Sequence, residues 1–171
     1  MQQDSLDLVL KYGKASNKVG KYESDLFINL PYGVVKIDLP NAQKSDDVND
    51  IINVIMQSQF EDFEAEKQSG NDLMSFLLWI KEQQEFIYNV EEQNLKSDPE
   101  PELISAGIHR LNEFGEDGTL ESIAKDWNIT PDEVRAKPYH VIYRKMKKDK
   151  ITKDIEKAYQ KIVEEKAKRK R

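Results

Sequence analysis

Few of the side chains that carry most protein chemistry are present in this sequence. It has two histidines, His109 and His140, and no cysteine, so disulfides and thiolate nucleophiles are excluded. His109 and Glu113 are four residues apart and could face one metal ion from a single helix. No third ligand is identifiable, and zinc sites use three or four. We therefore expect no metal site.

A glycine- and lysine-rich stretch, GKASNKVGKYES at 13–24, comes nearest to a phosphate-binding loop. Six residues separate Gly13 from Gly20 where that loop needs four, and Tyr22 follows Lys21 where Ser or Thr is required. We expect a solvated hairpin loop instead. No G-x-S-x-G elbow occurs, and no pair of carboxylates stands out as a general acid and base. The sequence predicts no catalytic residue, no cofactor and no enzymatic activity.

A strong signal for the start of a helix lies at Thr130. Thr is favoured at the N-cap, Pro131 suits the first helical position, and Glu133 can return a hydrogen bond in a capping box. Pro138 should stop this helix after about two turns, near Lys137, because proline removes a backbone donor and clashes with the preceding turn. The sequence therefore predicts a short helix that ends before a proline.

The apolar residues of 120–134 have the spacing of a helix-turn-helix corner. In a DNA reader, the first turn of the second helix faces bases and phosphates, and here it carries Asp132 and Glu133, which would repel a duplex. Arg135 and Lys137 could still contact the phosphate backbone. The corner thus favours docking on protein, with DNA binding as the alternative.

Beyond Pro138, apolar residues recur at helical spacing from Tyr139 to Met146 and predict a further amphipathic helix. Its apolar face could pack on the helix after residue 102. Alternatively, aromatic side chains could form an exposed docking patch, since aromatic residues are frequent anchors of interfaces. The candidate partner-binding residues are Trp79, Trp127, Tyr139 and Tyr143.

Charge is unevenly distributed along the 171 residues, whose net charge is -6. Residues 141–171 hold thirteen Lys or Arg against five Asp or Glu, so the rest of the chain is strongly acidic. Acidic body and basic tail could pair within a homo-oligomer, or the tail could bind an acidic partner or nucleic acid. The candidate nucleic-acid contacts are Arg144, Lys145, Lys147, Lys148, Lys168, Arg169, Lys170 and Arg171.

The first half of the chain predicts strands followed by helices. Period-two runs in the first 40 residues predict a small antiparallel β-meander, and a change to helical spacing predicts a helix capped by Ser45 and a second one after Gly70. The start of the second helix is apolar nearly all round, so either the meander or another subunit should cover its second side. The expected strands are 6–12, 25–30 and 33–39, and the first helix of this helical hairpin is 45–68.

The second half should be a compact helical unit. We expect a short amphipathic helix over 103–114, a turn over 115–118, and a helix capped by Thr119. The fold class is mainly helical α+β, with an N-terminal meander, a central helical hairpin, a C-terminal short-helix unit and a terminal basic helix. The expected division is 1–95, a linker over 96–101, a small helical unit over 102–150, and a basic helix or tail over 151–171.

A family resemblance covers about 45 residues of the C-terminal part. The pattern resembles the C-terminal motif of phage tail assembly chaperones: a small residue, a hydrophobic pair, [ST]-x-x-E-[LV], a break, and an aromatic-containing helix. The resemblance implies a non-enzymatic protein that helps to assemble, or forms part of, a tailed-phage particle, and it supplies no catalytic residues. The matching positions are Ala124, Trp127, Ile129, Thr130, Glu133, Val134, Pro138, Tyr139 and Tyr143.

We therefore expect a structural or assembly factor that binds other proteins through helical surfaces and could form a homo-oligomer. The longest apolar run, at 73–80, is far shorter than the roughly 18 residues of a membrane span. A location in the host cytoplasm or the virion follows, without membrane. The alternative is a DNA-binding accessory protein that uses the helix-turn-helix-like corner and the basic C-terminal segment.

Overall fold

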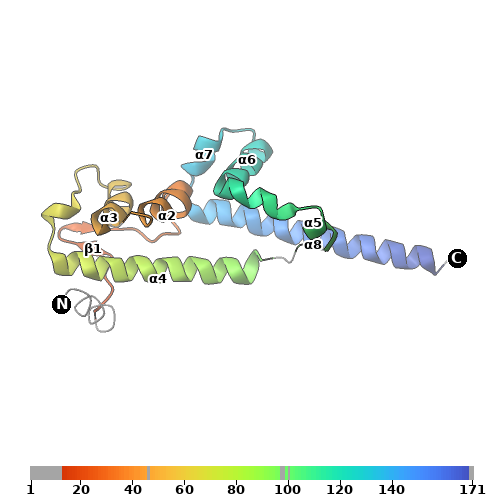
Figure 1. The fold of residues 1–171 in the computed structure, drawn as a ribbon, viewed down its shortest axis with the longest axis horizontal. Coiled ribbons are helices and arrows are strands. Elements are labelled where there is room, and N and C mark those ends of the chain that lie inside the picture. The colour runs from red at the N-terminus through yellow and green to blue at the C-terminus, as the bar shows by residue number, and fades with distance from the viewer. Residues whose placement is uncertain (1–12, 46, 97–98, 100, 170–171) are drawn as a thin grey trace.

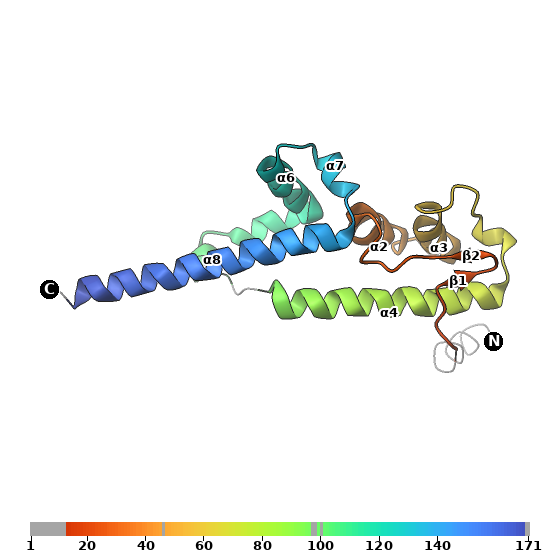
Figure 2. The ribbon, with the colours of Figure 1, turned by 180° about the vertical axis from the view of Figure 1, so that it is seen from behind.

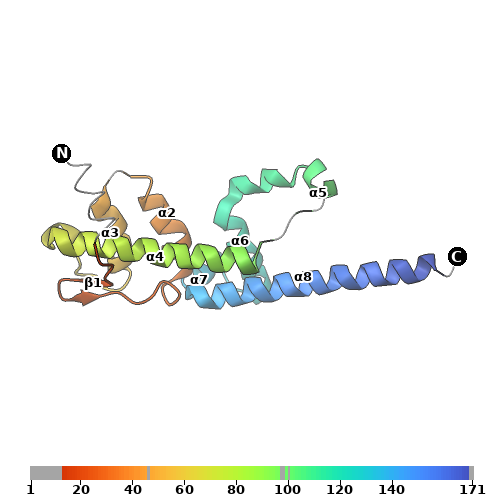
Figure 3. The ribbon, with the colours of Figure 1, turned by 90° about the horizontal axis from the view of Figure 1, so that it is seen from below.

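The computed structural model describes residues 13–45, 47–96, 99 and 101–169 (Figure 1). The fold is mainly helical, with one two-stranded antiparallel sheet near the N-terminus, and this confirms the predicted class. An N-terminal body stands at one end of the molecule. The last helix, α8 (Tyr139–Lys168), begins beside this body and extends past the other elements (Figures 1 and 3).

The sheet is a hairpin of β1 (Lys18–Val19) and β2 (Tyr22–Glu23), in the stretch predicted to be a loop. Lys18 pairs with Glu23 and Val19 with Tyr22. Gly20 has φ +58°, and a tight hairpin turn needs such a positive φ. The hairpin lies alongside α4 (Gly70–Asn94), seen best in Figure 2.

The strands predicted at 25–30 and 33–39 are wrong. Residues 25–26 have no regular secondary structure, residues 27–29 form a turn, and a π-helix, η1 (Val34–Asp38), runs into α2 (Leu39–Ala42). The partial alternation of 33–39 suggested a period of two, but Tyr32, Val35 and Leu39 are buried at helical spacing. The strand predicted at 6–12 lies outside the described residues.

The backbone of residues 28–32 does form hydrogen bonds, but with a segment distant in the sequence. Tyr32 N donates to Lys137 O (2.8 Å), and Tyr139 N donates to Leu30 O (2.8 Å). An isolated antiparallel bridge joins Pro31 and Pro138. Because the helix is interrupted at Pro138, backbone groups on either side of this proline are free to hydrogen-bond to the N-terminal body and hold the start of α8 to it.

The first helix is shorter than predicted: α3 spans Val48–Gln57 rather than 45–68, and its N-cap is Asp47 rather than Ser45. After Gln57 the chain turns back through a loop to a short 3-10 helix, η2 (Ala65–Lys67). The turn brings two aromatic rings of the loop onto Tyr22, at centroid distances of 5.3 and 5.2 Å. These rings belong to Phe60 and Phe63.

The second helix of the predicted pair, α4, carries the centre of the core. Trp79 stacks with Phe76 and meets Phe27 edge-on, with centroids 5.2 and 5.4 Å apart. The second apolar side of α4 is therefore covered by the chain's own N-terminal segment. Buried residues of α6 and α8 join the same core cluster.

The helices of the second half have other boundaries than predicted. The expected helix over 103–114 is divided at Gly107, whose φ is +87°, into α5 (Pro101–Ser105) and a 3-10 helix, η3 (Ile108–Phe114). The expected turn over 115–118 is the first turn of α6 (Gly115–Trp127), so Thr119 lies inside that helix and does not cap it. A short α7 (Pro131–Arg135) follows, and α8 runs without interruption through residue 151.

Candidate functional site

Two of the four predicted docking aromatics are core residues. Trp79 is 7% exposed and Tyr139 is 2% exposed, so neither offers surface to a partner in this structure. Trp127 and Tyr143 are partly buried and pack against the core cluster. The predicted aromatic patch is therefore largely an internal cluster, in which Tyr139 stacks between Tyr32 and Tyr143 at centroid distances of 6.1 Å.

A polar cluster surrounds these tyrosines and joins η1, α4, α6 and α8. Tyr32 Oη donates to Glu116 Oε2 (2.5 Å), and Tyr139 Oη donates to Glu91 Oε1 (2.8 Å). Lys36 Nζ lies 2.8 Å from Glu91 Oε2 and 3.7 Å from Glu116 Oε1. Burial is the main cause that raises the pKa of Tyr32, and the negative charge of Glu116 raises it further. In the same way, burial and then the charge of Glu91 raise the pKa of Tyr139.

Each member of this cluster has a partner of opposite charge or a hydrogen-bond partner. Both phenols stay protonated as donors to the carboxylates, because their raised pKa values move ionisation away from neutral pH. The arrangement satisfies buried polar groups and fixes four elements relative to one another. Sequence reasoning did not find this cluster, because Tyr32 and Glu116 are 84 positions apart and carry no spacing signal.

The short helix after Thr130 agrees with its prediction. Glu133 N donates to Thr130 Oγ1 (3.2 Å) and Thr130 N donates to Glu133 Oε2 (2.8 Å), which completes the capping box. The hydrogen bond from the Thr130 backbone lowers the pKa of Glu133. Arg135 lies against Gly33 and forms an ion pair with Asp38. Arg135, which the sequence offered as a possible phosphate contact, is thus paired with a carboxylate of its own chain.

The candidate nucleic-acid contacts differ in their surroundings. Lys145 Nζ lies 2.5 Å from carboxylate oxygens of both Asp126 and Asp149. Burial alone would lower the pKa of Lys145, but the hydrogen bonds to these carboxylates outweigh it, so the pKa is raised. Besides Lys145, three cations line a hollow beside Trp127, namely Arg144, Lys147 and Lys148. Two more, Lys168 and Arg169, are exposed at the end of α8. Lys170 and Arg171 lie outside the described residues.

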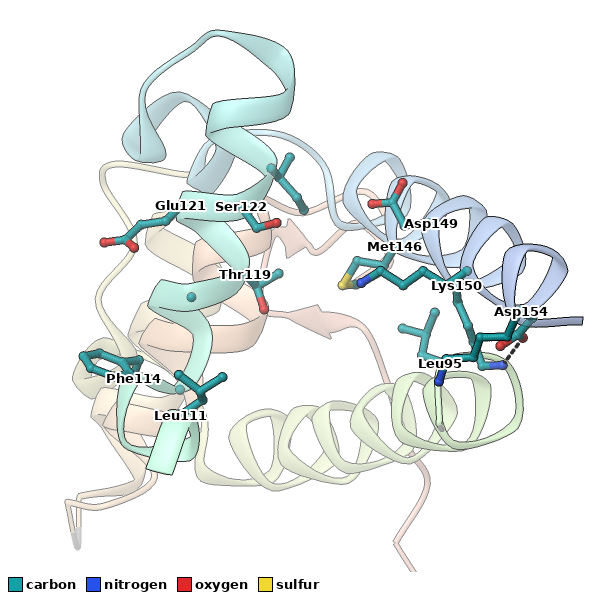
Figure 4. A pocket seen from close by; sticks show the side chains of 15 residues that line it. Leu95, Leu111, Phe114, Thr119, Glu121, Ser122, Met146, Asp149, Lys150 and Asp154 are labelled. Carbon is teal, nitrogen blue, oxygen red and sulfur yellow. Dashed lines mark hydrogen bonds and ion pairs between the residues drawn. The ribbon is translucent and has the colours of Figure 1, made fainter. Parts of the chain in front are cut away.

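A groove of about 740 Å³, which the sequence did not indicate, lies between η3, α6 and α8 (Figure 4). One side is formed by η3 and α6, the other by α8, and Leu95 closes the end near α4. Apolar side chains of η3 line one side of the groove, and charged residues of α8 line the other. The groove-lining residues used below are Leu95, Leu111, Phe114, Ile123 and Met146, with Asp149, Lys150, Lys153 and Asp154 on α8.

The η3 side of the groove belongs to an unusually exposed apolar surface. Leu111 is 64% exposed and Phe114 is 54% exposed, and Leu103 and Ile104 of α5 extend the same exposed segment. We call these four residues the wall. Contiguous apolar surface of this kind marks interaction sites in many proteins.

Metal and membrane features are limited in the part of the chain that the structure describes. Those residues include no group of three or more His, Cys, Asp or Glu side chains able to hold a metal ion. None of their helices is both long and apolar enough to cross a membrane.

The chain matches no protein-family model, no curated protein and no solved structure.

Proposed function

We propose that the protein is non-enzymatic and acts by binding other proteins, with the groove between η3, α6 and α8 as its docking surface. The observation that supports this most directly is the wall. Its side chains are apolar and roughly half exposed, and two of them, Leu111 and Phe114, line a groove large enough to receive a further side-chain layer. Apolar area of that kind is stabilised when another chain removes it from water.

The chemistry of the groove favours an amphipathic helix as the bound segment. Leu111 and Phe114 would receive the apolar face of such a helix. On the opposite side, Asp149, Lys150 and Lys153 carry charges of both signs and suit its polar edge. A helix lying in an apolar groove is a recurring mode of peptide recognition.

The finer proposal is a structural or assembly factor of a tailed phage. It is supported by the resemblance of 124–143 to tail assembly chaperones. The confirmed capping box at Thr130 and the break before Tyr139 are the parts of that motif whose geometry is most specific. Its partners would be other proteins of the assembly, in the host cytoplasm or in the virion.

A photo-crosslinking experiment in producing cells tests the docking surface. Phe114→p-benzoylphenylalanine places the reactive group at the groove, and Phe86→p-benzoylphenylalanine places it at an exposed position of α4 that does not line the groove. We expect a discrete protein adduct at 114 and none at 86. Adding Leu111→Gln should reduce the adduct about tenfold, the effect of losing about 1.4 kcal/mol of binding. Equal adducts at both positions would contradict the proposal.

The alternative, a DNA-binding accessory protein, is favoured by the exposed cations Arg144 and Lys148 of α8. Fluorescence anisotropy with a labelled duplex, from low to physiological salt, separates the two functions. Contacts to phosphate alone should be lost steeply as salt rises. Tight binding that persists at physiological salt and disappears in Arg144→Gln/Lys148→Gln would reverse the ranking.

A further inference from the structure

A second apolar surface lies on the part of α8 that projects from the molecule. Every residue from 151 to 168, which we call the arm, is exposed. Four of them, the arm row, recur at spacings of four, three and four, so they fall on one side of the helix. The arm row consists of Ile151, Ile155, Ala158 and Ile162, and its three isoleucines are 49%, 64% and 50% exposed.

The arm row points away from the chain's own groove. The groove is lined from α8 by residues such as Met146, Lys150, Lys153 and Asp154. At 100° per residue, the centre of that face lies about 140° around the helix axis from the centre of the arm row. The arm row therefore cannot cover the wall of its own chain unless α8 rotates and its buried residue Ile142 leaves the core.

Charge complements the two apolar surfaces. At the same spacing, the arm row continues into Lys148 at one end and Lys166 and Arg169 at the other. Near the wall, Glu113 is exposed on η3, and Asp117 and Glu121 are exposed on α6, which forms the same side of the groove. The cations at the two ends of the arm row and these carboxylates attract at long range, and the two apolar surfaces bury area on contact.

We infer that the arm of a second copy of this chain docks on the wall and enters the groove. This rests on the proposed function and names the bound helix: the occupant is α8 of another copy, with its arm row on Leu111 and Phe114. Duplex DNA fits the arm row less well, because a phosphate backbone offers nothing to cover three exposed isoleucines.

The contact joins two different patches, so each copy has one arm to give and one wall to receive. Such a contact closes into a two-fold dimer if the two copies exchange arms, and it extends into an open chain if they do not. In either case the mass in solution rises with protein concentration above that of one chain.

Sedimentation velocity over a concentration series, with three matched double variants, tests this contact. Ile155→Gln/Ile162→Gln removes apolar area from the arm, and Leu111→Gln/Phe114→Gln removes it from the wall. Phe86→Gln/Tyr88→Gln removes similarly exposed aromatic area from α4, outside both surfaces. The arm and wall variants should each stay monomeric where the wild type associates, and the α4 variant should associate like the wild type.

Mixing the arm and wall variants gives the decisive result. The intact arm of the wall variant can dock on the intact wall of the arm variant, so an equimolar mixture should recover association through one contact. Pairing of α8 with α8 would instead leave the wall variant unaffected and show no recovery, and that result would overturn the inference. A wild type that stays monomeric at every concentration would also overturn it. The protein would keep its proposed function if position 114 still captured a different protein.

Discussion

At the scale of single residues, Gly33 is placed where a side chain would collide with Arg135. A Cβ on Gly33 would lie 2.1 Å from Arg135 Cγ, which is near the base of that side chain, so Arg135 would have to leave Asp38. We expect Gly33→Ala to reduce the free energy of unfolding by about 1 to 3 kcal/mol, the range for overpacking. Urea denaturation monitored by circular dichroism measures this.

Two variants separate the collision from an intrinsic effect of alanine. Gly70→Ala is the matched control, because nothing lies within 4 Å of its would-be Cβ and alanine favours a helix there. In the double variant Gly33→Ala/Arg135→Ala the collision is absent, so the loss should be smaller than the sum of the single losses. Additive losses would show that Arg135 is not the cause.

At the scale of elements, the capping box fixes the start of α7 and with it the chain direction toward α8. Thr130→Ala removes the acceptor for Glu133 N and should cost about 1 kcal/mol of unfolding free energy. Thr152→Ala is the matched control. Its hydroxyl donates to Lys148 O within α8, where alanine is the better helix former, so we expect little change or a small gain. Equal losses in both variants would count against a capping role.

The same box gives a pH dependence of defined sign. The folded-state pKa of Glu133 is lowered, chiefly by its hydrogen bond from the Thr130 backbone. A carboxylate with a lowered folded-state pKa contributes stability above its unfolded pKa and loses it as pH falls through the folded-state value. The difference in unfolding free energy between wild type and Glu133→Gln should therefore be largest near neutral pH and should shrink on acidification. A difference that grows on acidification would be inconsistent with the box.

Elements with strong local signals were predictable, and those set by distant contacts were not. Thr130, Pro131 and Pro138 each act within one turn of helix, so the short α7 and the break after it followed from the sequence. The end of α3 at Gln57 depends on a loop whose aromatic rings pack on Tyr22. Because Tyr22 is far from this loop in the sequence, the residues around Gln57 do not predict the contact. The groove depends on the placement of η3 against α8, which the sequence spacing does not specify.

At the scale of the whole molecule, the two halves share a core while the arm stays outside it. Residues of α3, α4, α6 and α8 belong to one buried cluster. The cluster of Tyr32, Lys36, Glu91, Glu116 and Tyr139 adds polar contacts across the same elements. The expected boundary near 96–101 therefore separates segments of chain that pack together, whereas the change from buried to exposed residues occurs within α8.

This contrast within α8 predicts how backbone amides exchange with solvent. In dilute protein, amides of residues 142–146 should be protected by the core, whereas those of 152–168 should exchange much faster, because local opening of an exposed segment needs little free energy. As concentration rises, docking between copies should slow exchange both in the arm and in 108–114. Hydrogen-exchange mass spectrometry at two concentrations measures both regions at once. Protection gained by the arm alone would indicate contact between arms, and protection gained by neither region would show that the two surfaces do not meet.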